Sequence, residues 1–143
     1  MKKYLFAILM GAFVLSSCEP EEKDLVTAEA VTLNVSHVSP EQFTLSATFT
    51  INGKKETPCI YGIFVGDEPG LQHGALITEN KNASKPGTYP YTYVFNNQRG
   101  LVTPMYMYKP GTKVYYRAGI EVVTAEGGTW YYGEEKSFTV PAE

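Results

Sequence analysis

Apolar and polar residues alternate with a period of two through most of the chain. The clearest segment is residues 43–51, where every odd position is apolar and every even position is Ser or Thr. Successive side chains of a strand point to opposite faces, so this alternation is typical of a strand with one buried face. We therefore expect Phe49 to point into a core and Thr48 to point away from it.

Other strand-like segments follow at short intervals, with no sustained helical period between them. Pro90 cannot donate to a strand ladder, which predicts that its strand lies at a sheet edge. Seven or so short strands at this spacing predict an all-β fold, a two-sheet antiparallel β-sandwich. The further segments are residues 31–35, 59–66, 74–78, 88–95, 113–124 and 129–140, with turns expected at Asn52-Gly53 and at residues 125–128.

The first seventeen residues have the features of a secretory signal. Lys2 and Lys3 precede an apolar run, residues 4–15, that is shorter than the roughly 20 residues needed to span a bilayer as a helix. Small residues end on Cys18, and this segment resembles a bacterial lipoprotein signal. The resemblance implies a diacylglyceryl group on the Cys18 thiol and cleavage before it. An ordinary secretory signal with an incidental cysteine is the alternative.

An acidic, proline-containing segment follows Cys18, so we expect residues 18–28 to be a solvated tether before a sandwich domain at residues 29–143. This acidic run also resembles the tag with which certain Gram-negative bacteria export lipoproteins to the outer surface; plain linker composition is the alternative. The resemblance implies an outer-membrane lipoprotein exposed at the cell surface.

Charge and cysteine content narrow the classes of partner. Without residues 1–17 the chain has 10 basic and 15 acidic side chains, a net charge of −5, which argues against binding nucleic acid or an anionic membrane surface. With Cys18 lipidated, Cys59 has no cysteine to pair with. Its apolar surroundings predict a small buried hydrophobe rather than a nucleophile.

The second half of the chain resembles a fibronectin type III domain. Tyr108-Lys109-Pro110-Gly111-Thr112 is similar to the start of strand F in that family, and residues 127–140 are similar to the closing strand of such domains in bacterial surface lipoproteins. The segment that begins at Tyr61 is similar to the third strand. The resemblance implies an immunoglobulin-like sandwich and leaves the activity open.

The facing of residues 113–124 depends on which residue forms the family's tyrosine corner. Direct counting places that corner at Val114, so either Tyr115 replaces it after a one-residue bulge or the corner is absent. On the simplest register Arg117 points outward, as a solvated or cross-strand charge. The inward residues would then be Val114, Tyr116, Ala118, Ile120 and Val122.

No combination of residues with catalytic or metal-binding spacing is present. His37 and His73 are far apart, and the carboxylate pairs are adjacent residues that would face opposite ways in a strand. Residues 66–70 are better explained as a turn than as a calcium loop. We therefore expect a non-enzymatic protein with no metal and no cofactor.

Tyrosine is abundant and provides the candidate ligand-binding residues. One face of the predicted strand at residues 88–95 carries Tyr89, Tyr91, Tyr93 and Phe95, and these rings would be buried if that face packs against a core. The other tyrosines could instead form part of a binding surface, because amphipathic rings suit glycans and protein interfaces. The candidates are Trp130, Tyr131, Tyr132 and Tyr115.

These observations predict a lipid-anchored cell-envelope protein whose sandwich is a protein-interaction or spacer module. A glycan-binding module that uses exposed Trp and Tyr side chains is the alternative. Exposed aromatic rings beside Asn or Gln would favour a glycan, and a flat apolar patch, an open sheet edge or the loop at residues 96–111 would favour an envelope or host protein.

Overall fold

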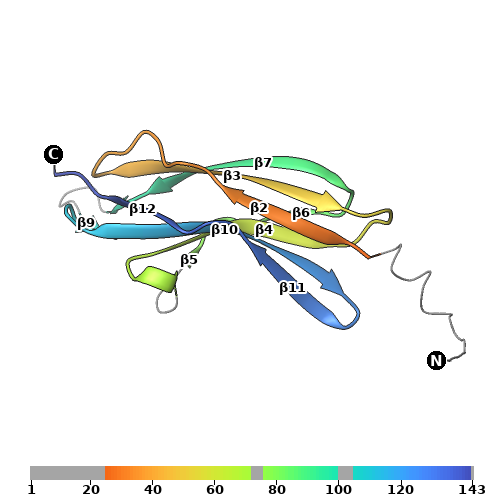
Figure 1. Ribbon diagram of the computed structural model, residues 1–143. Helices are drawn as coiled ribbons and strands as arrows, with labels where there is room; N and C mark the ends of the chain where they lie inside the picture. Colours follow the sequence, from red (N-terminus) through yellow and green to blue (C-terminus); the bar gives the residue numbers. More distant parts are fainter. Residues whose placement is uncertain (1–24, 72–75, 100–104, 143) are drawn as a thin grey trace, which may run out of the picture.

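The alternating segment around Phe49 forms strand β3, Gln42–Asn52, and its odd residues are all buried. Strand β3 lies between β2, Thr27–Thr32, and β7, Gly87–Asn96, in a three-stranded antiparallel sheet (Figure 1). Strand β7 is therefore an edge strand, as Pro90 predicts. The computed structural model describes residues 25–71, 76–99 and 105–142.

The second sheet is organised around β10, Lys113–Thr124, the longest strand of the described residues. On one side β10 pairs with β4, Cys59–Gly66. On its other side it pairs with β12, Lys136–Thr139, along its first half and with β11, Gly127–Tyr132, along its second half. Beyond β4 lie the short strands β5, Leu76–Ile77, and β6, Lys81–Ala83. With β5/β6 and β11/β12 each taken as one interrupted strand, the two sheets have seven strand positions, which confirms the predicted antiparallel sandwich.

Between β7 and β10 a short ribbon forms from β8, Gln98–Arg99, and β9, Met105–Tyr106. Asn97, which is fully buried, fixes this connection: its side chain donates to the Pro40 and Tyr108 carbonyls and accepts from the Tyr108 N–H, each at 2.8 Å. The loop predicted at residues 96–111 therefore has an ordered base. Within the described residues the helical structure is the 3-10 turn η1, Pro69–Leu71, and no helix there is long and apolar enough to cross a membrane.

The core lies between the inner faces of the two sheets. Phe49 from β3 meets Tyr61 from β4 with ring centroids 4.6 Å apart, so aromatic contacts join the sheets directly. Tyr91 and Phe95 of β7 are buried as expected, while Tyr89 and Tyr93 are half-buried against the same core. Cys59 is also buried in this core, which confirms that it packs as a small hydrophobe.

Tyr116 decides the facing of β10. Its ring is buried, and its hydroxyl donates to the Leu33 carbonyl at 3.1 Å and accepts from the Val35 N–H at 2.8 Å. A tyrosine thus links the two sheets, but neither Val114 nor Tyr115 supplies it. The simplest register is confirmed, because the inward residues Val114, Tyr116, Ala118, Ile120 and Val122 are all buried.

The first strand differs from its prediction in position and in facing. The sequence favoured a strand at residues 31–35, but β2 is Thr27–Thr32, and Val31 and Leu33 are largely exposed. The buried residues are Val26, Ala28 and Thr32, so the packed part of the chain includes Val26 and Ala28, which precede residue 29. Strand β2 also passes very close to Gly133, where an added Cβ would lie 2.9 Å from the Ala30 carbonyl oxygen, so a side chain at position 133 would clash. The inward residues Ala28 and Thr32 are small or polar and give little hydrophobic signal.

The last segment also differs, because the strand predicted at residues 129–140 is broken into β11 and β12. The turn before it is tighter than expected: Thr124 pairs with Gly127, so two residues connect the strands. Gly133, whose N–H donates to the Ala118 carbonyl at 2.9 Å, begins the break between β11 and β12. The β10–β11 hairpin consequently leaves the body of the sandwich at an angle, as Figure 1 shows.

We expect Phe49→Ala to lower the free energy of unfolding by about 3–5 kcal/mol, as truncation of large aromatic residues in cores does. Thr48→Ala, on the opposite face of β3, should change it by less than about 1 kcal/mol. Urea unfolding of both variants tests this difference. Equal losses would contradict the facing of β3.

Candidate functional site

Four side chains gather on the outer face of the larger sheet, the face turned away from the core. Phe64 comes from β4, Arg117 from β10, and Trp130 and Tyr132 from β11. Arg117 is paired with Phe64, and Tyr132 with Gly119, so the four share one face. We refer to Phe64, Arg117, Trp130 and Tyr132 as the outer-face cluster.

The members of the outer-face cluster are in direct contact. The rings of Trp130 and Tyr132 are stacked, with centroids 5.8 Å apart and planes at 6°. Phe64 meets Trp130 at 5.4 Å and Tyr132 at 6.0 Å in steeply inclined arrangements. The Arg117 guanidinium lies over the Tyr132 ring, 4.0 Å from its centroid, a distance suited to a cation–π contact.

Gly119 makes this packing possible. A Cβ at this position would lie 2.7 Å from Phe64 Cε2 and 3.3 Å from Tyr132 Cδ1. The rings therefore rest on the backbone of β10 where a side chain would otherwise stand. Gly128 has a similar role at the far end of the cluster, because the Glu121 carboxylate occupies the space beside it.

The strand register gives the order of these groups along the sheet. Trp130 is opposite Glu121 and Tyr132 is opposite Gly119, so Arg117 and Trp130 lie on opposite sides of Tyr132. One face of the Tyr132 ring contacts Arg117 and the other faces Trp130. A sugar stacks on a ring face, and the Arg117 guanidinium and the Trp130 ring already lie against those of Tyr132. Tyr132 is nevertheless 45% exposed, so part of it is accessible to a partner.

Three of the four candidates from the sequence lie on this outer face. Trp130 and Tyr132 belong to the outer-face cluster, and Tyr115 lies further along β10 beneath the Lys113 ammonium, 5.5 Å from the ring centroid. Tyr131 lies on the other face, where it pairs with Ile120 and is half-buried against the core. Ligand binding by these residues stays a prediction.

The edge of β7 is a second accessible feature. In the described part of the chain β7 pairs with β3 alone, and none of its ten residues is charged. Charged residues commonly protect edges from pairing with other chains, and here Pro90 is the protecting residue. Val94, on the solvent face of this strand, is 53% exposed.

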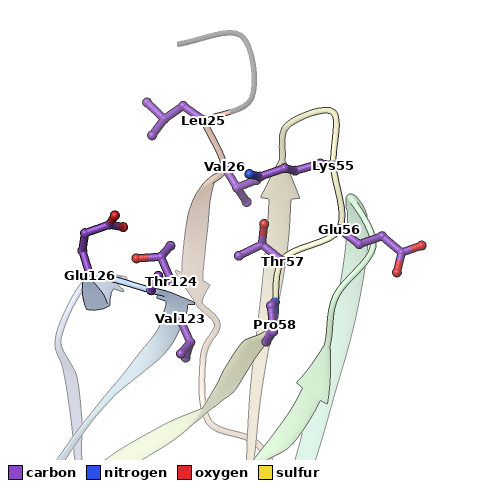
Figure 2. Close-up of a pocket in the computed structure, with 10 residues that line it drawn as sticks. Leu25, Val26, Lys55, Glu56, Thr57, Pro58, Val123, Thr124 and Glu126 are labelled. Atoms are coloured by element: carbon purple, nitrogen blue, oxygen red, sulfur yellow. The ribbon is translucent and has the colours of Figure 1, made fainter. Parts of the chain in front are cut away.

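A groove of about 850 Å³ opens at the end of the sandwich where β2 begins. Figure 2 shows Leu25 and Val26 on one side, the loop from Lys55 to Pro58 on another, and residues 123–126 of the β10–β11 hairpin on the third. Its lining combines apolar side chains with two threonines and the charged residues Lys55, Glu56 and Glu126. None of the four sequence candidates lines this groove.

Chemically reactive groups are not gathered in the described residues. Burial raises the pKa of the Cys59 thiol, and its Sγ donates to the Thr57 carbonyl at 3.3 Å, so this cysteine is a poor nucleophile. No three His, Cys, Asp or Glu side chains converge there as metal ligands. Cys18 and His73 lie outside the described residues.

Comparison with known proteins identifies relatives of the fold. No protein-family model and no curated protein matches the sequence. A solution structure of the sensor domain of the anti-sigma factor RsgI4 in Pseudobacteroides cellulosolvens is similar, with a TM-score of 0.58 and 10% identity over 81% of this chain and 76% of that chain. A shorter form of that domain gives 0.51 and 13% identity over 81% and 96%. At such low identity the likeness establishes the sandwich and leaves the function open.

We expect Gly119→Ala to displace Phe64 and Tyr132 and to lower the free energy of unfolding by about 1–3 kcal/mol, as overpacking does. Trp130 is the single tryptophan of the chain, so its emission reports directly on the outer-face cluster. The emission should shift to longer wavelength as the ring becomes more hydrated. Ser137→Ala, an exposed change on the same face, is the control and should leave both readings unchanged. A Gly119→Ala variant with the spectrum and stability of the wild type would contradict the packing described.

Proposed function

We propose that this protein is a lipid-anchored, non-enzymatic module of the cell envelope that binds a partner protein through the outer-face cluster. The observation that carries the proposal is the contact of the exposed Tyr132 with the half-buried Trp130 and Arg117 on one outer sheet face. Tryptophan, tyrosine and arginine are the residues most enriched among those that dominate binding energy at protein interfaces. The similarity to a sensor domain of an anti-sigma factor is compatible with a recognition role.

The sandwich is of the fibronectin type III kind in this proposal. The segments similar to the third strand, strand F and the closing strand are β4, β10 and β11/β12. They pair in one sheet with β10 in the middle. Tyr116 takes the part of a corner tyrosine, because its hydroxyl bonds to backbone groups near Leu33.

The anchor would keep one end of the sandwich close to the membrane. Residue 25, where the described chain begins, is seven residues after Cys18, a reach of at most about 23 Å at roughly 3.3 Å per residue. The end with the groove at Leu25 would then face the membrane, and the outer-face cluster would face sideways. A partner alongside in the same envelope, at the outer membrane surface, would meet this cluster directly.

A glycan ligand is the second candidate, favoured by the exposed Tyr132 and the half-buried Trp130 beside it. The ring faces weigh against it, because Tyr132 is sandwiched between Arg117 and Trp130. The ring and cation contacts of the outer-face cluster in the described structure involve no Asn or Gln. The protein-binding function is therefore the better supported of the two.

We expect Cys18→Ala to abolish membrane association and to leave an unprocessed or secreted form. A single acyl chain binds membranes marginally, and the two or more chains of a lipoprotein hold stably. Detergent partitioning and metabolic labelling with a palmitate analogue measure this. Partitioning of the variant with the membrane fraction, as for the wild type, would disprove the lipid anchor.

We expect Trp130→Ala to weaken partner binding by at least about 1–2 kcal/mol, the usual effect of removing an aromatic hot spot. Thermal unfolding should change little, because Trp130 is half-buried at the surface and leaves no enclosed cavity. A photo-reactive residue placed in intact cells at Glu121, which lies opposite Trp130 on the outer face, should cross-link a protein, and Trp130→Ala should remove that product. The same residue placed at Thr92, on the far sheet, is the control. Cross-linking from position 121 that is indifferent to Trp130→Ala would argue against the site, and glycan-array binding that Trp130→Ala abolishes would favour the glycan function.

A further inference from the structure

Arg117 is held in a fixed position on the outer face. Its guanidinium lies over the Tyr132 ring at 4.0 Å, and its Nε is buried without a hydrogen-bond partner in the described structure. Packing against a ring also fixes the plane of the guanidinium. The side chain has therefore already lost much of the conformational freedom that binding would otherwise remove.

The neighbouring carboxylates do not neutralise Arg117. Glu134 forms an ion pair with Lys136 at 3.7 Å, and Glu135 accepts from the Gly70 N–H at 3.0 Å. Glu121 lies beside Gly128, at the opposite end of the outer-face cluster from Arg117. Within the residues that the structure describes, Arg117 thus has an aromatic contact but no carboxylate contact.

A partly desolvated guanidinium without a counter-ion is a strong site for a carboxylate. Arginine presents its N–H groups as a planar fork that matches the two oxygens of a carboxylate. A carboxylate placed at this fork would be attracted more strongly beside the rings than in open water, because the aromatic side chains lower the local polarity. The charge of Arg117 therefore selects the chemistry of its ligand.

We propose that Arg117 anchors an Asp or Glu side chain of the partner protein, with an adjacent apolar side chain covering Tyr132 and Trp130. This inference rests on the proposed function and specifies the chemistry of the partner. An acidic polysaccharide would share the carboxylate, but its sugar rings would need free aromatic faces, and those of Tyr132 are occupied. The occupant is thus an acidic segment of a folded or extended protein.

The test screens a displayed library of random twelve-residue peptides for binding to the chain from residue 18 that carries Cys18→Ser. Peptides that shift the emission of Trp130 are retained. We expect them to contain an Asp or Glu next to an aromatic or aliphatic residue. Replacing that acid by its amide should weaken binding to the wild-type domain about tenfold and should not change binding to Arg117→Gln. Arg117→Lys keeps the charge without the planar fork and should recover only part of the loss.

The possible outcomes separate this inference from the function on which it rests. Peptides that need Trp130 but show no acidic preference would overturn the inference and leave the protein-binding function intact. Selected peptides whose binding is indifferent to Trp130→Ala would contradict the function itself. Oligogalacturonate that shifts Trp130 emission in an Arg117-dependent way, where no peptide does, would overturn the inference in favour of an acidic glycan. Thermal unfolding of Arg117→Gln checks that the sandwich is intact.

Discussion

The hydroxyl of Tyr116 sets the constraint on which the rest of the structure depends. Its ring fills the core from β10, while its oxygen bonds to the backbone at Leu33 and Val35, just after β2 in the other sheet. A slip of β10 by one residue would break both bonds and would place Tyr115 or Arg117 in the core. Burial raises the pKa of Tyr116, so the hydroxyl stays protonated and able to donate across the physiological range.

The fixed register of β10 also creates the surface on the other side of the strand. Because even residues are committed to the core, the odd residues Arg117, Gly119 and Glu121 must face outward. Gly119 then leaves bare backbone on which Phe64 and Tyr132 pack. The core and the proposed recognition surface therefore lie on opposite faces of one strand.

Period-two alternation was enough to predict the sandwich, the faces of β3 and the inward series of β10. It failed at β2, where the inward residues Ala28 and Thr32 give little hydrophobic signal while the apolar Val31 and Leu33 are exposed. The candidate site was predicted in part: Trp130 and Tyr132 lie where strand alternation places them, but Phe64 and the contact of Arg117 with Tyr132 were missed. Those contacts follow from the strand register of the hairpin. That register depends on a two-residue turn, and the sequence is also compatible with a longer turn.

The angle of the β10–β11 hairpin to the sandwich explains why an aromatic cluster can exist on an outer face at all. Once β11 ends and Gly133 begins the break, β12 resumes pairing with the first half of β10 and sends Phe138 into the core beside Phe43. Tyr131 of β11 still packs against the core, while the outward side chains Trp130 and Tyr132 pack on one another. A cluster stabilised by its own ring contacts is stiff, and a stiff surface loses little entropy when a partner binds. Such a surface suits recognition of a shaped protein partner better than the adaptable stacking of sugar rings.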